Sequence, residues 1–138
     1  MKNMKPYDYL KKTTQFEEWV RTLNPVTQAV VIARTERARN AGYFGDHHGI
    51  QGKSKGGNRI SEMRIDSGPG WRLYYTAWEY RGQVLLMLVG GDKSTQRRNI
   101  KLALAIVDEA KAKAEREIDE ELSKREEAQK HGQHRKKH

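Results

Sequence analysis

The pattern of hydrophobic and polar positions along the chain begins with a helical repeat. Apolar residues recur at helical spacing between Phe16 and Leu23, after a short extended opening near residues 5–10. Thr14 and Glu17 have the spacing of a capping box, so the pattern predicts a first helix over residues 14–23.

A second helix is predicted directly after the first. Asn24 supplies an N-cap, Pro25 a pre-set first helical residue, and Gly42 a stop. This helix carries on one stripe Val26, Val30, Ala33 and Arg37. Residues 43–58 then lack periodicity and hold five glycines between positions 45 and 58, which predicts a mobile loop.

Three strands follow the loop. Residues 59–66 and 71–78 alternate between apolar and polar positions, with a tight Ser-Gly-Pro-Gly turn between them at 67–70. Residues 83–89 are nearly all apolar, which is typical of a strand that is covered on both faces.

A long helix is predicted from about Ser94 or Thr95 onwards. Apolar residues recur at intervals of three and four as far as Leu122, and the positions after it are charged and end in a basic tail. We therefore divide the chain into a folded domain, residues 1–110, and a charged helical extension with a basic tail, residues 111–138.

Composition limits the chemistry. The chain has no cysteine, which excludes disulfides, thiolate metal sites and a cysteine nucleophile. No apolar run approaches the roughly 20 residues of a membrane span, and the first residues lack a secretory signal, so a cytoplasmic protein with no membrane association is expected.

Charge adds a partner class. The net charge is +9, and residues 1–100 hold 17 Lys and Arg against 9 Asp and Glu. Such a positive field attracts polyanions, so nucleic acid or an acidic protein is the natural partner; charge kept for solubility is the alternative. In the glycine-rich loop the basic side chains predicted to touch an anionic partner are Lys53, Lys55 and Arg59.

The predicted hairpin concentrates charge on one face. Alternation puts Met63 and Ile65 on one side of the first strand and Glu62 and Arg64 on the other, and the turn sets Arg64 opposite Arg72. Two arginines so placed destabilise a sheet, and an anion between them would relieve the repulsion.

A structural ion network is the alternative reading of this face. In it Glu62, Asp66 or Asp92 would neutralise the two arginines without any ligand.

The segment GGDKST at residues 90–95 is not a nucleotide-binding loop. A Walker loop requires a glycine directly before its lysine, and Asp92 stands there. Lys93 is instead expected to reach the rim of the charged face, if the strand over residues 83–89 pairs beside the one over residues 71–78.

Two stretches carry a family resemblance. GPGWRLYY at residues 68–75 and LLMLVGGDKSTQ at residues 85–96 resemble the HigB-like addiction-module killer proteins of the RelE/ParE toxin superfamily, supported by SEMRI at 61–65. The match covers roughly residues 5–110. It implies an α+β fold in which a small antiparallel sheet, in the order β-α-α-β-β-β, packs against two N-terminal helices, here followed by a long C-terminal helix.

The resemblance also implies an activity. Many relatives are toxins of type II toxin–antitoxin systems that cleave mRNA on the ribosome as metal-independent endoribonucleases. Arg72 matches the arginine that acts on the scissile phosphate, Arg64 a neighbouring basic residue, Glu62 a position that serves as base in some relatives, and Lys93 lies near the position of the acid.

The hypothesis is therefore RNA cleavage by attack of the ribose 2′-hydroxyl. Glu62 removes its proton, Arg64 and Arg72 stabilise the developing charge, and Lys93 or Tyr74 protonates the leaving oxygen. Tyr74 is also a candidate RNA contact, and no metal or other cofactor is expected.

The expected partners are mRNA, the ribosome and an adjacently encoded antitoxin of the helix-turn-helix type. Two alternatives remain open: a non-catalytic ParE-like toxin that binds DNA gyrase, and a basic RNA-binding module without cleavage.

Overall fold

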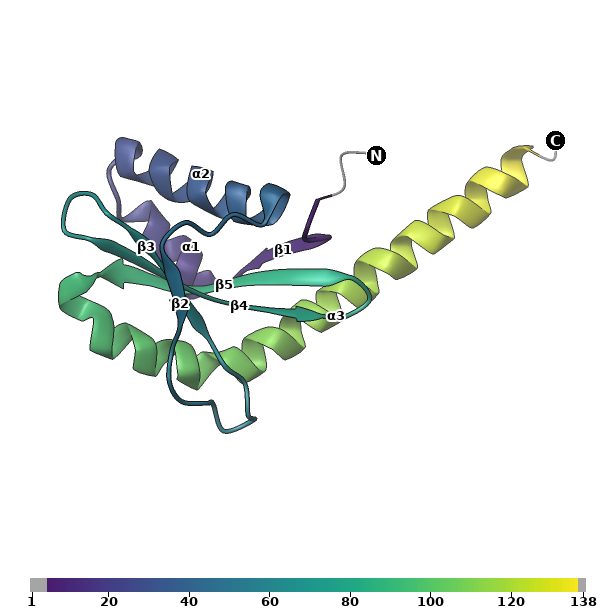
Figure 1. Cartoon of the computed structure of the whole chain (residues 1–138). Coiled ribbons are helices and arrows are strands. Elements are labelled where there is room, and N and C mark those ends of the chain that lie inside the picture. The colour runs from purple at the N-terminus through teal and green to yellow at the C-terminus, as the bar shows by residue number, and fades with distance from the viewer. Residues whose placement is uncertain (1–4, 137–138) are drawn as a thin grey trace.

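The computed structural model describes residues 5–136, with side chains as far as residue 130. Its elements, in chain order, are β1 (Tyr9–Lys12), α1 (Thr14–Arg21), α2 (Pro25–Ala41), β2 (His47–Gly49), β3 (Ser61–Ile65), β4 (Trp71–Glu79), β5 (Gln83–Asp92), the short 3-10 turn η1 (Lys93–Thr95) and α3 (Gln96–Lys136). The predicted α+β fold with two N-terminal helices and a long C-terminal helix is confirmed (Figure 1).

The sheet has five strands in the order β1-β5-β4-β3-β2. Strands β2 to β5 pair antiparallel, but β1 pairs with β5 in parallel, so the sheet is mixed rather than wholly antiparallel. Parallel pairing requires a long connection between the two strands, and the chain provides one. After β1 it runs through α1 and α2 and then enters the sheet at the opposite edge, at β2.

Both N-terminal helices have well-formed ends. The N-cap of α1 is Thr13, whose backbone is extended and whose hydroxyl accepts the amide of Phe16 at 3.0 Å; the predicted capping box at Thr14 is thus wrong by one residue. Asn24 caps α2 and accepts the amide of Thr27, and Gly42 ends this helix with φ of 66°, both as predicted.

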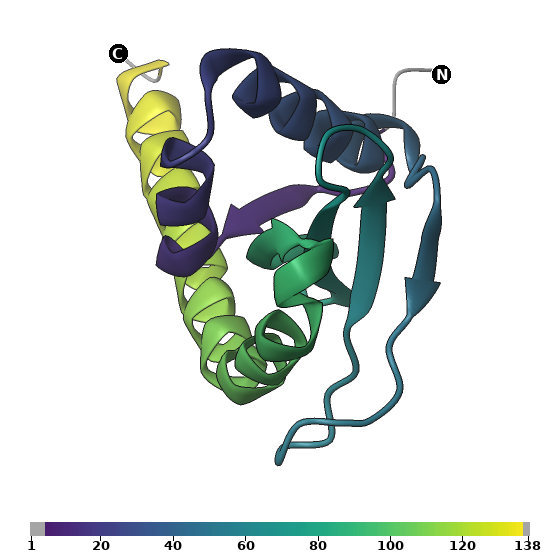
Figure 2. The same ribbon diagram turned by 90° about the vertical axis from the view of Figure 1, so that its left-hand side faces the viewer.

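The sheet is covered on both faces (Figures 1 and 2). Helices α1 and α2 pack on one face over an apolar cluster that includes Phe16, Met63 and Leu73, and α3 packs on the other over Leu88 and Val107. The apolar strand β5 is therefore buried on both sides, as its sequence predicted.

Helix α2 packs through a different stripe from the predicted one. Its buried residues are Val31, Thr35 and Ala38, whereas Val26 is 76% exposed and Val30 38%. Because apolar residues lie on both sides of this helix, periodicity alone did not identify the side that faces the sheet.

The segment 43–58, predicted as a mobile loop, is largely fixed. It contains β2, and its glycine-rich part is held against α3 by Asp108, which accepts hydrogen bonds from Ser54 (2.5 Å), the amide of Gly56 (2.8 Å) and Asn58 (2.6 Å). These hydrogen bonds hold the pKa of Asp108 below its ordinary value. Asp108 lies about fifty positions from the loop in the sequence, so the glycine content of the loop did not indicate that it would be held in place.

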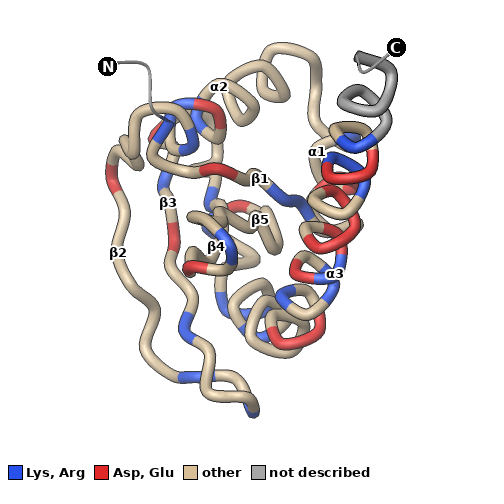
Figure 3. The backbone as a smooth tube through the Cα atoms, turned by 90° about the vertical axis from the view of Figure 1, so that its right-hand side faces the viewer, with Lys and Arg blue, Asp and Glu red and all other residues tan. Residues whose placement is uncertain are grey.

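Helix α3 packs on the sheet well past residue 110. Ala114 and Ile118 are buried, Trp78 donates to Glu115 at 3.0 Å, and Tyr80 donates to Asp119 at 3.0 Å. Residues 123–130 are exposed, and in Figure 3 both signs of charge alternate along the helix. The predicted division of the chain after residue 110 therefore falls inside a packed helix, and the side chains of the basic tail lie outside the described residues.

No described helix has the length and apolarity to cross a membrane.

Candidate active site

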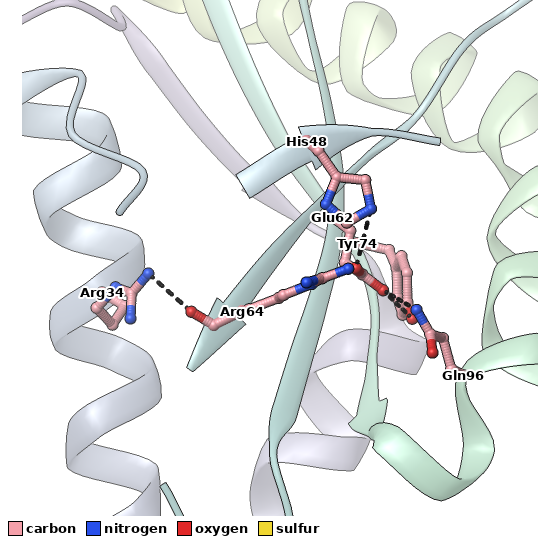
Figure 4. Close-up of polar contacts among 6 residues, drawn as sticks. All are labelled: Arg34, His48, Glu62, Arg64, Tyr74 and Gln96. Atoms are coloured by element: carbon pink, nitrogen blue, oxygen red, sulfur yellow. Dashed lines mark hydrogen bonds and ion pairs between the residues drawn. The ribbon is translucent and has the colours of Figure 1, made fainter. Parts of the chain in front are cut away.

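The predicted opposition of two arginines is present. Strands β3 and β4 pair with Arg64 directly opposite Arg72, in the register that the turn over residues 67–70 predicted. Gly68 and Gly70 take φ of 54° and 78° in this turn, which explains why glycine stands at both positions. From α2, Arg34 donates to the backbone carbonyl of Arg64 at 3.1 Å and so fixes this part of β3 (Figure 4).

Glu62 differs most from its predicted setting. It was expected on a solvent-facing surface, but it is fully buried beneath the start of α3. One carboxylate oxygen accepts Arg64 Nε at 3.1 Å and lies 3.3 Å from His48 Nε2; the other accepts the Tyr74 hydroxyl at 2.7 Å and Gln96 Nε2 at 2.9 Å (Figure 4).

The electrostatics of Glu62 follow from these contacts. Burial alone would raise the pKa of Glu62, but hydrogen bonds from Tyr74, Arg64 and Gln96, with the charge of His48, outweigh burial and lower the pKa below 4.5. The carboxylate is therefore charged and fully engaged at neutral pH.

Tyr74 belongs to the same buried network. Its side chain is fully buried, and burial followed by the hydrogen bond to Glu62 raises the pKa of Tyr74 far above its ordinary value. In this arrangement its hydroxyl holds the carboxylate and does not reach the surface where RNA was predicted to bind.

Two members of the network were missed at the sequence level. His48 lies on β2 opposite Glu62, and Gln96 is the first residue of α3. The sequence analysis gave His48 no role, because β2 was not predicted and this histidine lay in a segment expected to be a loop. Gln96 is the last residue of the motif GGDKSTQ, so the motif pointed to this residue. Nothing in the neighbouring sequence showed that the start of α3 would place its side chain against Glu62 on β3.

Arg72 lacks the neutralising partner that Arg64 has. Its Nε atom is buried without a hydrogen-bond acceptor, and no ion pair of Arg72 occurs among the side chains that the structure describes. Asp92 is engaged instead by Ser94 and Thr95 as the cap of η1. The structural ion network considered above therefore exists for Arg64, through Glu62, and does not extend to Arg72.

Lys93 follows β5 directly and is exposed. A β-carbon added at Gly70 would lie 3.7 Å from the β-carbon of Lys93, so Lys93 lies beside the turn that leads into Arg72. Its ammonium has no ion pair within the described part of the chain.

The basic residues of the loop between β2 and β3 are all exposed, namely Lys53, Lys55 and Arg59. In Figure 3 the Lys and Arg positions follow this loop away from the sheet. Because the loop is fastened to α3 through Asp108, these charges are presented at fixed places, which favours contact with an extended anion.

The site is an open surface. Two hollows of about 360 and 210 Å³ lie elsewhere, beside β1 and α1, and neither includes Glu62 or Arg72. Within residues 5–130, no group of three or more acidic or histidine side chains could hold a metal ion. A surface of two partly exposed arginines and an exposed lysine beside a buried carboxylate suits a polymeric anion better than a small enclosed ligand.

Comparison with known proteins gave three findings. No family model matches the chain. An uncharacterized protein of Haemophilus influenzae is 38% identical over 101 residues, which are 72% of this chain and 93% of that protein. Among solved structures, a mutant of the Escherichia coli toxin RelE in the free state is similar over 70% of this chain and 96% of that one, at 15% identity and a TM-score of 0.47.

Proposed function

The chain belongs to one family with the uncharacterized Haemophilus influenzae protein, and we propose that it is the toxin of a type II toxin–antitoxin system. Within the RelE/ParE superfamily we assign it to the HigB-like branch, on the motifs around Arg72 and Lys93. Its activity in this proposal is metal-independent cleavage of mRNA, on the ribosome, with an adjacently encoded antitoxin as its inhibitor.

The state of Arg72 is the observation that carries the proposal. Arg72 faces a second arginine across the sheet, and its Nε is buried with no acceptor. Such an arrangement is unfavourable in the free protein, because like charges repel and a buried donor without a partner costs about 1–3 kcal/mol. A phosphate group bound between the two guanidinium groups would offset their repulsion, since its negative oxygens accept from guanidinium groups in a bidentate manner.

The reaction uses chemistry that RNA supplies. The ribose 2′-oxygen attacks the adjacent phosphorus, and Arg64 and Arg72 stabilise the negative charge that builds on the phosphate oxygens. Lys93 is the candidate donor of a proton to the leaving 5′-oxygen. Glu62 holds Arg64 in place from below, and Lys53, Lys55 and Arg59 bind the RNA on either side of the cleaved bond.

The test is a cleavage assay with purified protein, translating ribosomes and a defined mRNA. We expect fragments ending in a 2′,3′-cyclic phosphate, unchanged by a metal chelator, and no cleavage where the scissile nucleotide is 2′-deoxy. Arg72→Ala should lower the rate about 10²–10³-fold. Arg21→Ala, an exposed arginine of α1, is the matched control and should leave the rate unchanged.

The opposite outcomes are equally definite. Intact mRNA together with inhibited supercoiling by gyrase would support the ParE-like alternative. Salt-sensitive RNA binding without fragments would support a binding module.

A further inference from the structure

His48 and Glu62 form a pair that the proposed reaction has not yet used. His48 on β2 stands directly opposite Glu62 on β3, and its Nε2 lies 3.3 Å from the carboxylate. The two side chains differ in access: His48 is 41% exposed and Glu62 is not exposed at all (Figure 4). The histidine is therefore the member of the pair that a bound RNA can touch.

The carboxylate itself is a poor candidate for proton removal. A carboxylate offers about four acceptor sites, and four groups surround this one: Arg64, Tyr74 and Gln96 donate hydrogen bonds to it, and His48 Nε2 lies 3.3 Å from one oxygen. Its lowered pKa further weakens it as a base. No acceptor site remains for a ribose hydroxyl.

We propose that His48 Nδ1 is the general base of the reaction and that Glu62 is a positioning residue acting through His48; this inference rests on the proposed endoribonuclease function. When its proton is on Nε2, which lies 3.3 Å from the Glu62 carboxylate, the imidazole has a free lone pair on Nδ1. Among the described residues no hydrogen-bond partner of Nδ1 is found. The arrangement follows the logic by which a buried carboxylate orients a catalytic imidazole and stabilises its charged form.

The proton and bond balance is complete. His48 Nδ1 takes the proton of the 2′-hydroxyl, the bond from the 2′-oxygen to phosphorus forms, and the bond from phosphorus to the 5′-oxygen breaks. Lys93 gives a proton to the departing oxygen, and both residues return to their starting states by exchange with water. The products are a 2′,3′-cyclic phosphate and a free 5′-hydroxyl.

His48, the arginine pair and Lys93 stand at successive positions along the strand direction of the sheet. His48, Glu62 and Tyr74 occupy one row of the register, and Arg64 and Arg72 the next, about 6–7 Å along the strands. Lys93 follows Asp92, which pairs with Trp71, so it lies beyond the arginine row on the side away from His48. Along the strand direction the proposed base comes first, the phosphate-binding arginine pair second and the proposed acid third.

His47 provides a matched control. It precedes His48 on the same strand, but its Nδ1 lies 2.8 Å from the carbonyl of Gly45 and its ring stands 5.5 Å from Phe44. In His48→Gln the amide can still donate to Glu62, which keeps the network while removing the base. The experiment is single-turnover cleavage of RNA across pH by the full-length protein, its His48→Gln variant and its His47→Gln variant, with the melting temperature of each.

We expect His48→Gln to lose about 10²–10⁴-fold in rate, without loss of melting temperature, and to lose the rise of rate with pH that an imidazole base produces. The charged group in contact with the imidazole is Glu62 from β3, and this carboxylate in turn holds Arg64 from β3, Tyr74 from β4 and Gln96 from α3. His47→Gln leaves these groups untouched and should keep both the rate and the pH profile.

Two further measurements identify the role. Added imidazole should restore cleavage by His48→Ala and should not restore Arg72→Ala. An RNA with sulfur in place of the leaving 5′-oxygen needs no acid; rescue of His48→Gln by this substrate would mean that His48 is an acid and would overturn the assignment.

The failures are distinguishable. Wild-type cleavage with an unaffected His48→Gln variant, or a slower variant whose pH profile is unchanged, overturns this inference alone. A wild-type protein that never cleaves RNA overturns the proposed function and the inference with it.

Discussion

The two faces of the central sheet are made by the same strands from different chemistry. On the face toward α1 and α2, Met63, Leu73 and Tyr75 form a buried apolar cluster. On the face toward α3, the residues next to them in the chain are Glu62 and Arg72. Alternation along β3 and β4 thus separates an apolar face from a face that carries, beside the apolar residues packed under α3, charges that are only partly compensated, and the two can be perturbed one residue apart.

The largest effect should come from the apolar face. Leu73→Ala removes a fully buried side chain and should lower the free energy of unfolding by about 2–5 kcal/mol, measured by urea denaturation. Arg72→Ala, its neighbour, should change stability by no more than about 0.5 kcal/mol, or raise it, because it ends the repulsion with Arg64. A large loss in Arg72→Ala would mean that the charged face stabilises the fold after all.

A smaller effect is expected where the charged face is buried. Tyr74→Phe removes the hydroxyl that donates to Glu62 and should cost about 1.5–3 kcal/mol, because hydrogen bonds to charged groups are stronger than neutral ones. In a Glu62→Gln background the same change should cost less, and the double-mutant cycle measures this coupling. Strictly additive costs would show that the hydroxyl and the carboxylate do not depend on each other.

The smallest effect concerns pH. The pKa of Glu62 is lower in the folded protein than its ordinary value of 4.5, so its contribution to stability is present above about pH 4.5 and is lost as pH falls through the folded-state pKa. Thermal unfolding between pH 7 and 3 should therefore show a steeper acid loss in the wild type than in Glu62→Gln. If the melting temperature of both proteins fell equally steeply with decreasing pH, other carboxyl groups would be responsible for the loss of stability in acid.

Local signals in the sequence were sufficient for much of the fold. The cap at Asn24, the stop at Gly42 and the opposition of Arg64 and Arg72 each depend on residues close together in the chain, and all three were predicted correctly.

What the sequence could not supply were contacts between distant segments. The parallel pairing of β1 with β5 and the hold of Asp108 on the glycine-rich loop join residues about fifty or more positions apart. The burial of Glu62 has the same origin, because it depends on where α3 begins to cover β3. The contact of His48 with Glu62 was missed for the same reason. It depends on the pairing of β2 with β3, and a strand of three residues is too short to show an alternating pattern in the sequence.

The two glycines at the end of β5 have a consequence for mutational scanning. A β-carbon at Gly90 would collide with the ring of Trp19, and one at Gly91 with Asn99 and Thr95 of the opposite layer. A substitution at Gly90 would have to displace the Trp19 ring, and one at Gly91 the side chains of Asn99 and Thr95, so both positions would score as intolerant for packing reasons alone. Saturation data for this family need a separate readout of folding before intolerance at such positions is taken as a sign of chemistry.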